Sequence, residues 1–166
     1  MKGYFLALEG PDGSGKSTIA NMLKEYIESL NLSCTLTREP GGTSIGEDIR
    51  KILLSNDNLE MSNRTEALLY AASRAQHVDE KIRPIKESGE IIICDRYVFS
   101  SLAYQGFSRN LGIEEVMKIN EFAIDGFYPD RILFFKIDPT LSLRRKFIDR
   151  EGDRWEIEGE DFHKRV

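Results

Sequence analysis

A glycine-rich segment near the start of the chain constrains its fold more than any other feature. Residues 10–17 read GPDGSGKS and match the pattern G-x-x-x-x-G-K-[ST], directly after an apolar run at residues 4–8. Glycines in this pattern let the backbone turn so that successive N–H groups face a phosphate, and a helix beginning near Lys16 adds its positive dipole end. A chance glycine-rich turn would lack this setting. The sequence therefore predicts a phosphate-binding P-loop between a strand and a helix.

The side chains of this loop suit a nucleoside triphosphate. Lys16 is expected to reach the β- and γ-phosphates, and the hydroxyl of Ser17 is expected to supply one oxygen ligand to magnesium. Magnesium is therefore the implied cofactor. The predicted nucleotide-binding residues of this segment are Gly10, Pro11, Asp12, Gly13, Ser14, Gly15, Lys16, Ser17 and Thr18.

Short apolar runs alternate with helical patterns along the rest of the chain. Such alternation is typical of an α/β fold, in which helices cover both faces of a parallel sheet. Asn63 and Glu66 resemble a capping box at the start of the third helix. No repeat or linker divides the chain, so residues 1–166 are expected to form one domain. Strands are predicted at residues 4–8, 33–37, 91–94 and 132–137, and helices at 16–30, 43–54, 64–82 and 112–125.

Composition excludes several classes of function. The formal net charge of −5 argues against broad nucleic-acid binding. No apolar run approaches the about 18 residues of a membrane span, and the early P-loop leaves no room for a signal peptide. We therefore expect a cytoplasmic protein with no membrane partner. Cys34 and Cys94 lie on separate predicted strands and are interpreted as buried thiols, while two histidines argue against a histidine-rich metal site.

A second group of polar residues follows the third predicted strand. Asp95 and Arg96 lie at its carboxyl end, where open α/β sheets place their ligands. Asp95 could hold magnesium or its water, and the planar fork of Arg96 suits a phosphate on a second substrate. The alternative is an ordinary salt bridge at the end of a strand.

Two further groups lie nearby in the predicted fold. Arg38 and Glu39 follow the second strand, where a rigid loop could carry both charges toward the same cleft. Tyr70 and Arg74 are four residues apart on the third helix and share one face. A ring and a guanidinium together suit a planar base, although such a pair alone is more often a core residue beside a surface residue.

Three segments carry a resemblance to the thymidylate kinases. Residues 95–105 (DRYVFSSLAYQ) resemble the signature segment of that family, and residues 37–42 (TREPGG) resemble its bacterial loop. Residues 70–76 (YAASRAQ) are similar to its helix segment. The resemblance covers nearly the whole chain. It implies a three-layer P-loop NTPase fold and transfer of the γ-phosphoryl group of ATP to dTMP, giving dTDP and ADP for dTTP biosynthesis.

The resemblance also implies roles for individual residues. Asp12 would contact the 3′-hydroxyl of the sugar, and Arg96 would hold the monophosphate. Tyr104 would occupy the space of a ribose 2′-hydroxyl. Thymine would stack on the ring of Tyr70 and would form hydrogen bonds with Arg74 and Ser101. The full implied substrate-binding set is Asp12, Arg38, Glu39, Tyr70, Arg74, Arg96, Ser100, Ser101, Tyr104 and Gln105, and the implied metal ligands are Ser17, Asp95 and Glu39.

A cation-rich segment near the end of the chain resembles the lid of the bacterial-type enzymes. The P-loop has no arginine between Asp12 and Lys16, so the charge needed for transfer must come from elsewhere. Residues 144–157 are predicted to form the lid, in which Arg144 contacts ATP. The alternative is a solvated, charged helix end. The expected catalytic residues are Lys16, Arg96, Arg150 and Arg154.

The sequence departs from the family pattern in two places. Trp155 replaces a smaller aliphatic residue in the lid, and the chain ends at Val166, before the last strand and helix expected of a relative. Rival functions are a GTP-dependent switch, a non-catalytic nucleotide-binding module and another nucleoside monophosphate kinase. The GTP-dependent switch is disfavoured because the sequence has no Asn-Lys-x-Asp segment for binding guanine. The amphipathic stretch at residues 113–122 is interpreted as core or as the face of a homodimer.

Overall fold

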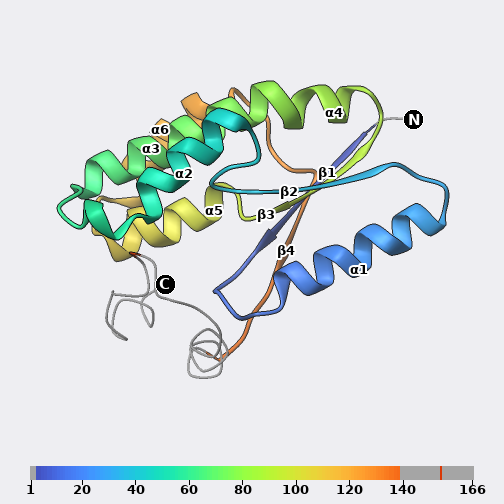
Figure 1. Cartoon of the computed structure of the whole chain (residues 1–166), viewed down its shortest axis with the longest axis horizontal. Helices are drawn as coiled ribbons and strands as arrows, with labels where there is room; N and C mark the ends of the chain where they lie inside the picture. Colours follow the sequence, from blue (N-terminus) through green and yellow to red (C-terminus); the bar gives the residue numbers. More distant parts are fainter. Residues whose placement is uncertain (1–2, 139–153, 155–166) are drawn as a thin grey trace.

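The computed structural model describes residues 3–138 and Arg154. Strands and helices alternate along this part of the chain (Figure 1). None of the helices described is long and apolar enough to cross a bilayer. In chain order the elements are β1 (Tyr4–Glu9), α1 (Lys16–Ser29), β2 (Cys34–Arg38), α2 (Ser44–Leu54), the short 3₁₀ turn η1 (Asn56–Asn58), α3 (Asn63–His77), the π-helical η2 (Val78–Ile82), α4 (Arg83–Glu87), β3 (Ile91–Asp95), α5 (Val98–Ser101), the π-helical η3 (Leu102–Ser108), α6 (Ile113–Ile124) and β4 (Arg131–Phe134).

The four predicted strands form one parallel sheet in the order β2-β3-β1-β4. In its register Tyr4 pairs with Ile91 and Leu6 pairs with Arg131. The fourth strand, β4, ends three residues earlier than the apolar run suggested. Because the strands are parallel, the carboxyl ends of β1, β2 and β3 meet at one edge, where the P-loop begins.

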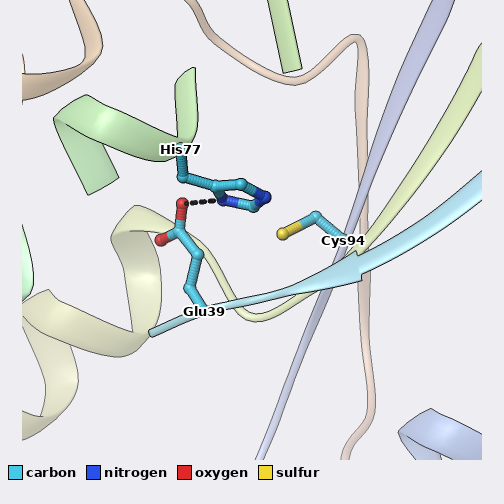
Figure 2. Close-up of side chains that lie close together, drawn as sticks. All are labelled: Glu39, His77 and Cys94. Carbon is cyan, nitrogen blue, oxygen red and sulfur yellow. Dashed lines mark hydrogen bonds and ion pairs between the residues drawn. The ribbon is translucent and has the colours of Figure 1, made fainter. Parts of the chain in front are cut away.

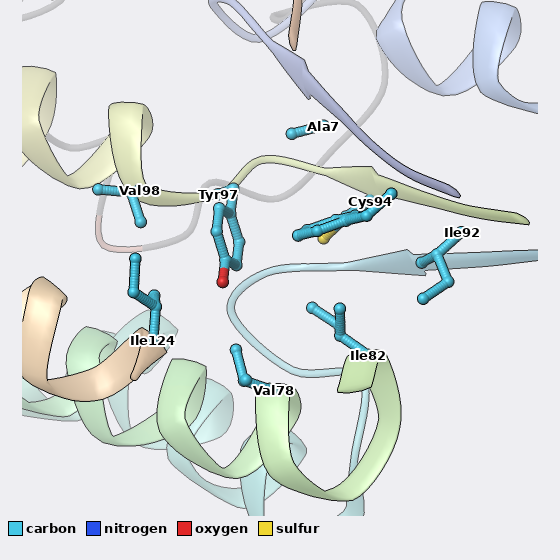
Figure 3. Packing of buried hydrophobic residues seen from close by; sticks show 9 residues of the cluster. Ala7, Val78, Ile82, Ile92, Cys94, Tyr97, Val98 and Ile124 are labelled. Atoms are coloured by element: carbon cyan, nitrogen blue, oxygen red, sulfur yellow. The ribbon is translucent and has the colours of Figure 1, made fainter. Parts of the chain in front are cut away.

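Alternation of side chains along the strands fills a core on each face of the sheet. Phe5 and Ala7 of β1 point to one face with Ile92 and Cys94 of β3, where Tyr97 and residues of η2, α5 and α6 complete the cluster (Figure 3). The other face packs against α1. There the buried cluster is Leu8, Ala20, Cys34 and Ile93. The predicted three-layer α/β fold is therefore confirmed, and both cysteines are buried.

Helices α2 and α3 begin where polar side chains cap them. Thr43 caps α2 by accepting from the backbone N–H of Gly46 at 3.1 Å, and Ser62 caps α3 by accepting from Thr65 at 3.2 Å. The capping box predicted at Asn63 is therefore wrong by one residue. Glu66 does not reach back to the cap, because its carboxylate is buried and binds other side chains.

The helical pattern predicted for residues 64–82 corresponds to two elements. Regular α3 ends at His77, and the chain continues through the wider turns of η2. A second helical stretch, Val98 to Ser108, was not predicted from the sequence. It comprises α5 and η3 and starts two residues beyond Arg96, so it begins next to the carboxyl edge of the sheet.

Candidate active site

The P-loop has the conformation that phosphate binding requires. Gly10, Gly13 and Gly15 have φ values of 146°, 73° and 90°, which favour glycine. A Cβ on Gly10 would lie 2.7 Å from the carbonyl oxygen of Phe135, so the neighbouring strand end also demands glycine there. Gly15 is the N-cap of α1 and offers no side chain. The first N–H groups of α1 are thus open to an anion.

Lys16 folds over this loop. Its Nζ donates to the carbonyl oxygens of Gly10 at 2.9 Å and Pro11 at 2.8 Å, and the residue is buried. Burial lowers the pKa of Lys16 to about 8, and Arg96 adds to the reduction, while Asp95, Asp12 and Glu9 oppose it. A bound polyphosphate would therefore favour the charged form of Lys16.

This pKa predicts how nucleotide affinity depends on pH. Above pH 8 the ammonium of Lys16 loses its proton in the empty site, and the neutral amine cannot neutralise a phosphate. Affinity for a non-hydrolysable ATP analogue should therefore fall roughly tenfold between pH 7.5 and 9, with uptake of about one proton on binding at pH 9. Calorimetry in two buffers of different ionisation enthalpy measures both. Lys16→Met should bind more weakly without this slope, and an equal slope in both proteins would contradict the assignment.

A cleft of about 720 Å³ opens beside the P-loop at the carboxyl edge of the sheet. It combines cations suited to phosphates with carboxylates suited to a metal or a sugar. Its lining residues are Asp12, Gly13, Gly15, Lys16, Ser17, Thr18, Arg38, Glu39, Arg50, Asp95 and Arg96. Ten of the predicted site residues, from three separate segments, line this cleft. The predicted residues Tyr70, Arg74, Ser100, Ser101, Tyr104 and Gln105 are not among its lining residues.

Ser17 and Asp95 form a site that fits magnesium. The hydroxyl of Ser17 donates to Asp95 Oδ2 at 2.8 Å. The other carboxylate oxygen of Asp95 is buried and has no hydrogen-bond partner within the described part of the chain. An orphaned carboxylate oxygen beside a hydroxyl is a suitable pair of hard oxygen ligands for Mg²⁺.

Arg96 lines the cleft, and its guanidinium is held by neighbouring side chains. It has a φ of 70°, in the left-handed region that a residue with a side chain rarely adopts. Its guanidinium donates to Asp12 at 2.5 Å and to Ser100 Oγ at 3.0 Å, and it lies 5.3 Å from the centre of the Tyr104 ring. Burial raises the pKa of Tyr104, so its hydroxyl stays protonated. The structure thus joins P-loop and signature segment through one cation.

Arg74 is buried between α3 and the segment that follows β3. It donates to Glu39 at 2.6 Å, to Ser101 Oγ at 3.1 Å, to the carbonyl oxygen of Tyr97 at 3.1 Å and to Asn120. Four of the five N–H donors of the guanidinium are used by these contacts. Tyr70, one turn earlier on α3, is half-buried. The guanidinium of Arg74 is therefore fixed in one orientation.

Glu39 orients Arg74 rather than standing open to a cation. Its second oxygen contacts His77 Nδ1 at 3.0 Å (Figure 2). The other ring nitrogen, His77 Nε2, contacts Thr37 Oγ1 at 2.7 Å. Cys94 lies beside this pair, and burial raises the pKa of its thiol well above the usual range. The arrangement Glu39, His77 and Cys94 has metal-ligating atoms, but Glu39 Oε1 is already in contact with His77 Nδ1 and Glu39 Oε2 accepts from Arg74. We assign it as a hydrogen-bond network.

The remaining predicted residues are placed as follows. Arg38 ends β2 and pairs with Glu47 at 2.9 Å. Gln105 donates to Glu66 at 3.0 Å, and Arg154 also pairs with Glu66 and donates to the carbonyl oxygen of Leu53 at 3.0 Å. The structure therefore does not bring Arg154 to the P-loop. Arg144 and Arg150 lie outside the described residues.

Two site residues were missed by the sequence reasoning. Arg50 of α2 lines the cleft and donates to the carbonyl oxygen of Pro40 at 3.0 Å. Glu9 ends β1 and is buried, with its carboxylate directed at the segment that follows Arg96. A carboxylate at the end of an apolar strand, directly before a P-loop, was a usable signal. Arg50 gave none, because an arginine within a helical pattern is ordinary.

Comparisons with known proteins agree on one family. The family model "Thymidylate kinase" matches residues 8–166. The chain is 52% identical to the thymidylate kinase of Clostridium novyi, over 99% of this chain and 82% of that one, and 54% identical to that of Finegoldia magna, over 98% and 80%. The crystal structure of thymidylate kinase from Ehrlichia chaffeensis superposes with a TM-score of 0.77 at 33% identity, covering 87% of this chain and 82% of that one. This chain belongs to the thymidylate kinase family.

Proposed function

We propose that this protein transfers the γ-phosphoryl group of ATP to dTMP, giving dTDP and ADP. The observation that carries the proposal is the contact between Asp12 of the P-loop and Arg96 of the signature segment. A simple nucleotide hydrolase or switch has no need of a second phosphate-binding cation in contact with its P-loop. Both phosphates of a kinase reaction would meet at this point.

The acceptor is proposed to lie between Arg96 and Arg74. Arg96 would hold its phosphate, and Asp12 would accept from the 3′-hydroxyl of the sugar. The ring of Tyr104, beside Arg96, would leave no room for a 2′-hydroxyl. Among the described residues, four N–H donors of Arg74 have protein partners, and the fifth would suit a base carbonyl oxygen, while Tyr70 supplies a ring for stacking. Ser101, Gln105, Arg38 and Glu39 complete this proposed site.

Charge neutralisation and alignment would supply most of the catalysis. Lys16 is proposed to bridge the β- and γ-phosphates, while the backbone N–H groups of the loop bind their remaining oxygens. Ser17 and Asp95 are the residues that would hold magnesium, which would neutralise phosphate charge when bound. Arg96 would hold the acceptor phosphate in line with the donor. ATP as donor favours a cytoplasmic location.

The lid arginines are proposed to act differently from each other. Arg150 is retained as a cation for the transition state, whereas Arg154 could act there only after leaving its buried pair with Glu66. Arg150→Ala should lower kcat about 100-fold and leave dTMP affinity and Tm unchanged. Arg154→Ala should lower the free energy of unfolding by about 2 kcal/mol, because a buried carboxylate loses a partner but keeps Arg109.

Steady-state kinetics and thermal melts of both variants separate these roles. Near-normal turnover of Arg150→Ala would show that Arg150 does not act in the transition state. A fall in kcat for Arg154→Ala at unchanged Tm would instead place Arg154 in the transition state.

A homodimer is proposed from apolar side chains that stay exposed on two helices. Helices α3 and α6 pack side by side (Figure 1), and Leu68 on α3 is 57% exposed while Phe122 on α6 is 90% exposed. Burying the ring of Phe122 against a second subunit would remove its apolar surface from water. Light scattering should give twice the 19.0 kDa mass of the chain, and a monomer at micromolar concentration would contradict this proposal.

Incubation with labelled ATP, magnesium and dTMP tests the function. Labelled dTDP should form in proportion to enzyme. Nucleotide binding without any dTDP would instead support a non-catalytic binding module.

A further inference from the structure

The carboxylate of Glu9 lies between the P-loop and the segment that carries Arg96. Glu9 is the last residue of β1, directly before Gly10, and only 3% of it is exposed. A buried carboxylate normally binds several donors, because desolvation of the charge is otherwise costly. Among the described residues, the donors that the Glu9 carboxylate binds all lie at the start of α5.

Glu9 caps α5 from another part of the chain. Its Oε1 accepts from the backbone N–H of Tyr97 at 2.9 Å and from that of Ser100 at 3.3 Å. Tyr97 is the N-cap residue of α5 and makes no side-chain cap of its own. The carboxylate therefore satisfies N–H groups that would otherwise lack partners at this end of the helix. This ties the end of β1 to the start of α5.

The same carboxylate sets the direction of the Ser100 hydroxyl. Ser100 Oγ donates to Glu9 Oε2 at 2.6 Å, so its lone pairs are left to face Arg96, whose guanidinium donates to it at 3.0 Å. The other side of the guanidinium binds Asp12. Ser100 and Asp12 therefore hold the guanidinium from two sides, and the ring of Tyr104 lies 5.3 Å from it.

We propose that Glu9 is a positioning residue that aims Arg96 at the acceptor phosphate through the hydroxyl of Ser100. Glu9 also precedes the loop that holds the donor phosphates. One carboxylate therefore sets the distance between the donor cradle and the cation that binds the acceptor. The inference rests on the proposed function in one respect, the assignment of the acceptor phosphate to Arg96.

The substitution Glu9→Gln distinguishes positioning from a simple charge effect by its sign. Removing a negative charge beside an anion site should strengthen binding of the acceptor, if charge alone mattered. Loss of positioning should weaken it. We expect the KM for dTMP to rise about 10- to 100-fold, with kcat changed less and affinity for ADP within about twofold of wild type.

Ser100→Ala tests the same path by a second route. Alone it should raise the KM for dTMP. Combined with Glu9→Gln it should raise the KM little further, because both substitutions break the same path from Glu9 through Ser100 to Arg96. Asp130→Asn is a matched control at the opposite end of β1, where Asp130 accepts from the backbone N–H of Phe5 at 2.7 Å and pairs with Lys86 at 2.6 Å. It should lower Tm and leave the KM for dTMP unchanged.

Unchanged or lower KM in Glu9→Gln would overturn the proposal, as would additive effects of the two substitutions. If Glu9→Gln does not fold, a normal KM in Ser100→Ala overturns it alone. Crystal structures of wild type and Glu9→Gln read the geometry without any activity, since the guanidinium of Arg96 should leave Asp12 in the variant. Absence of dTMP phosphorylation by the wild type would refute the proposed function but not this geometric result.

Discussion

Replacing Lys16 with methionine should lower kcat about 1000-fold, while the protein stays folded. Lys16 is buried and lines the cleft, and its ammonium is held over the P-loop by the carbonyl oxygens of Gly10 and Pro11. Removing a preorganised cation from a water-poor site costs far more than removing one in water. Methionine keeps most of the unbranched side chain but removes the ammonium, with its charge and its N–H donors. Single-turnover phosphoryl transfer measures the effect on the chemical step.

Lys24→Met is the matched control for this experiment. Lys24 lies on the same helix, α1, and its ion pair with Glu28 at 3.5 Å is exposed. Such pairs contribute only about 0.3 kcal/mol. The control should therefore keep full activity and nearly full stability. A Lys16→Met protein with kcat within tenfold of wild type would contradict the role assigned to Lys16.

Arg96→Met should lower kcat/KM for the acceptor about 1000-fold. This substitution removes the cation that contacts Asp12 and Ser100, and with it the proposed site of the acceptor phosphate. Loss of charge-assisted hydrogen bonds to a phosphate and of charge at the transition state accounts for this magnitude. Methionine at a φ of 70° is as strained as arginine, so backbone strain does not change. Kinetics with varied dTMP at saturating ATP separate the effects on KM and kcat.

Arg83→Met controls for the loss of a cation from the same face of the sheet. Arg83 pairs with Asp125 at 3.1 Å and lies over the ring of Phe127, away from the cleft lining. The control should lose some stability and keep its kinetics. Equal kcat/KM for Arg96→Met and Arg83→Met would show that Arg96 does not bind the acceptor.

The strands and the P-loop could be predicted because their signals are local. The run at residues 91–94 is entirely apolar, as expected for a strand covered on both faces, and it became β3 with one further residue. The loop pattern between strand and helix indicated the edge of the sheet where the cleft lies. Asp95 and Arg96 were placed at that edge by the same rule, and the structure puts both in the cleft lining.

Local sequence signals did not predict the structure correctly where two neighbouring residues could both cap a helix, or where a distant residue caps it. Ser62 and Asn63 are both good caps, and only the backbone shows that Ser62 accepts from Thr65. The helical stretch from Val98 to Ser108 was missed because β-branched and aromatic residues begin it and no side chain caps it locally. Its cap is Glu9, 91 residues before Ser100 in sequence.

Contacts between distant segments could not be read from periodicity. Glu39 was predicted as a metal ligand, yet its two oxygens are used by Arg74 and His77, which are 35 and 38 residues away. Arg154 was predicted beside the donor phosphates and pairs instead with Glu66. In both cases the sequence identified the charged residue but not its partner. A buried charge pairs with an opposite charge that the fold brings close to it, and that charge can come from a distant segment.

We propose that the cleft beside the P-loop phosphorylates thymidylate. Purified protein with ATP and magnesium should be offered dTMP, dUMP, CMP, AMP and GMP separately, and kcat/KM measured for each. We expect the highest value for dTMP, because Arg74 is proposed to bind one base edge and Tyr104 is proposed to occupy the space of a 2′-hydroxyl. A higher kcat/KM for any of the other four acceptors would contradict this substrate assignment.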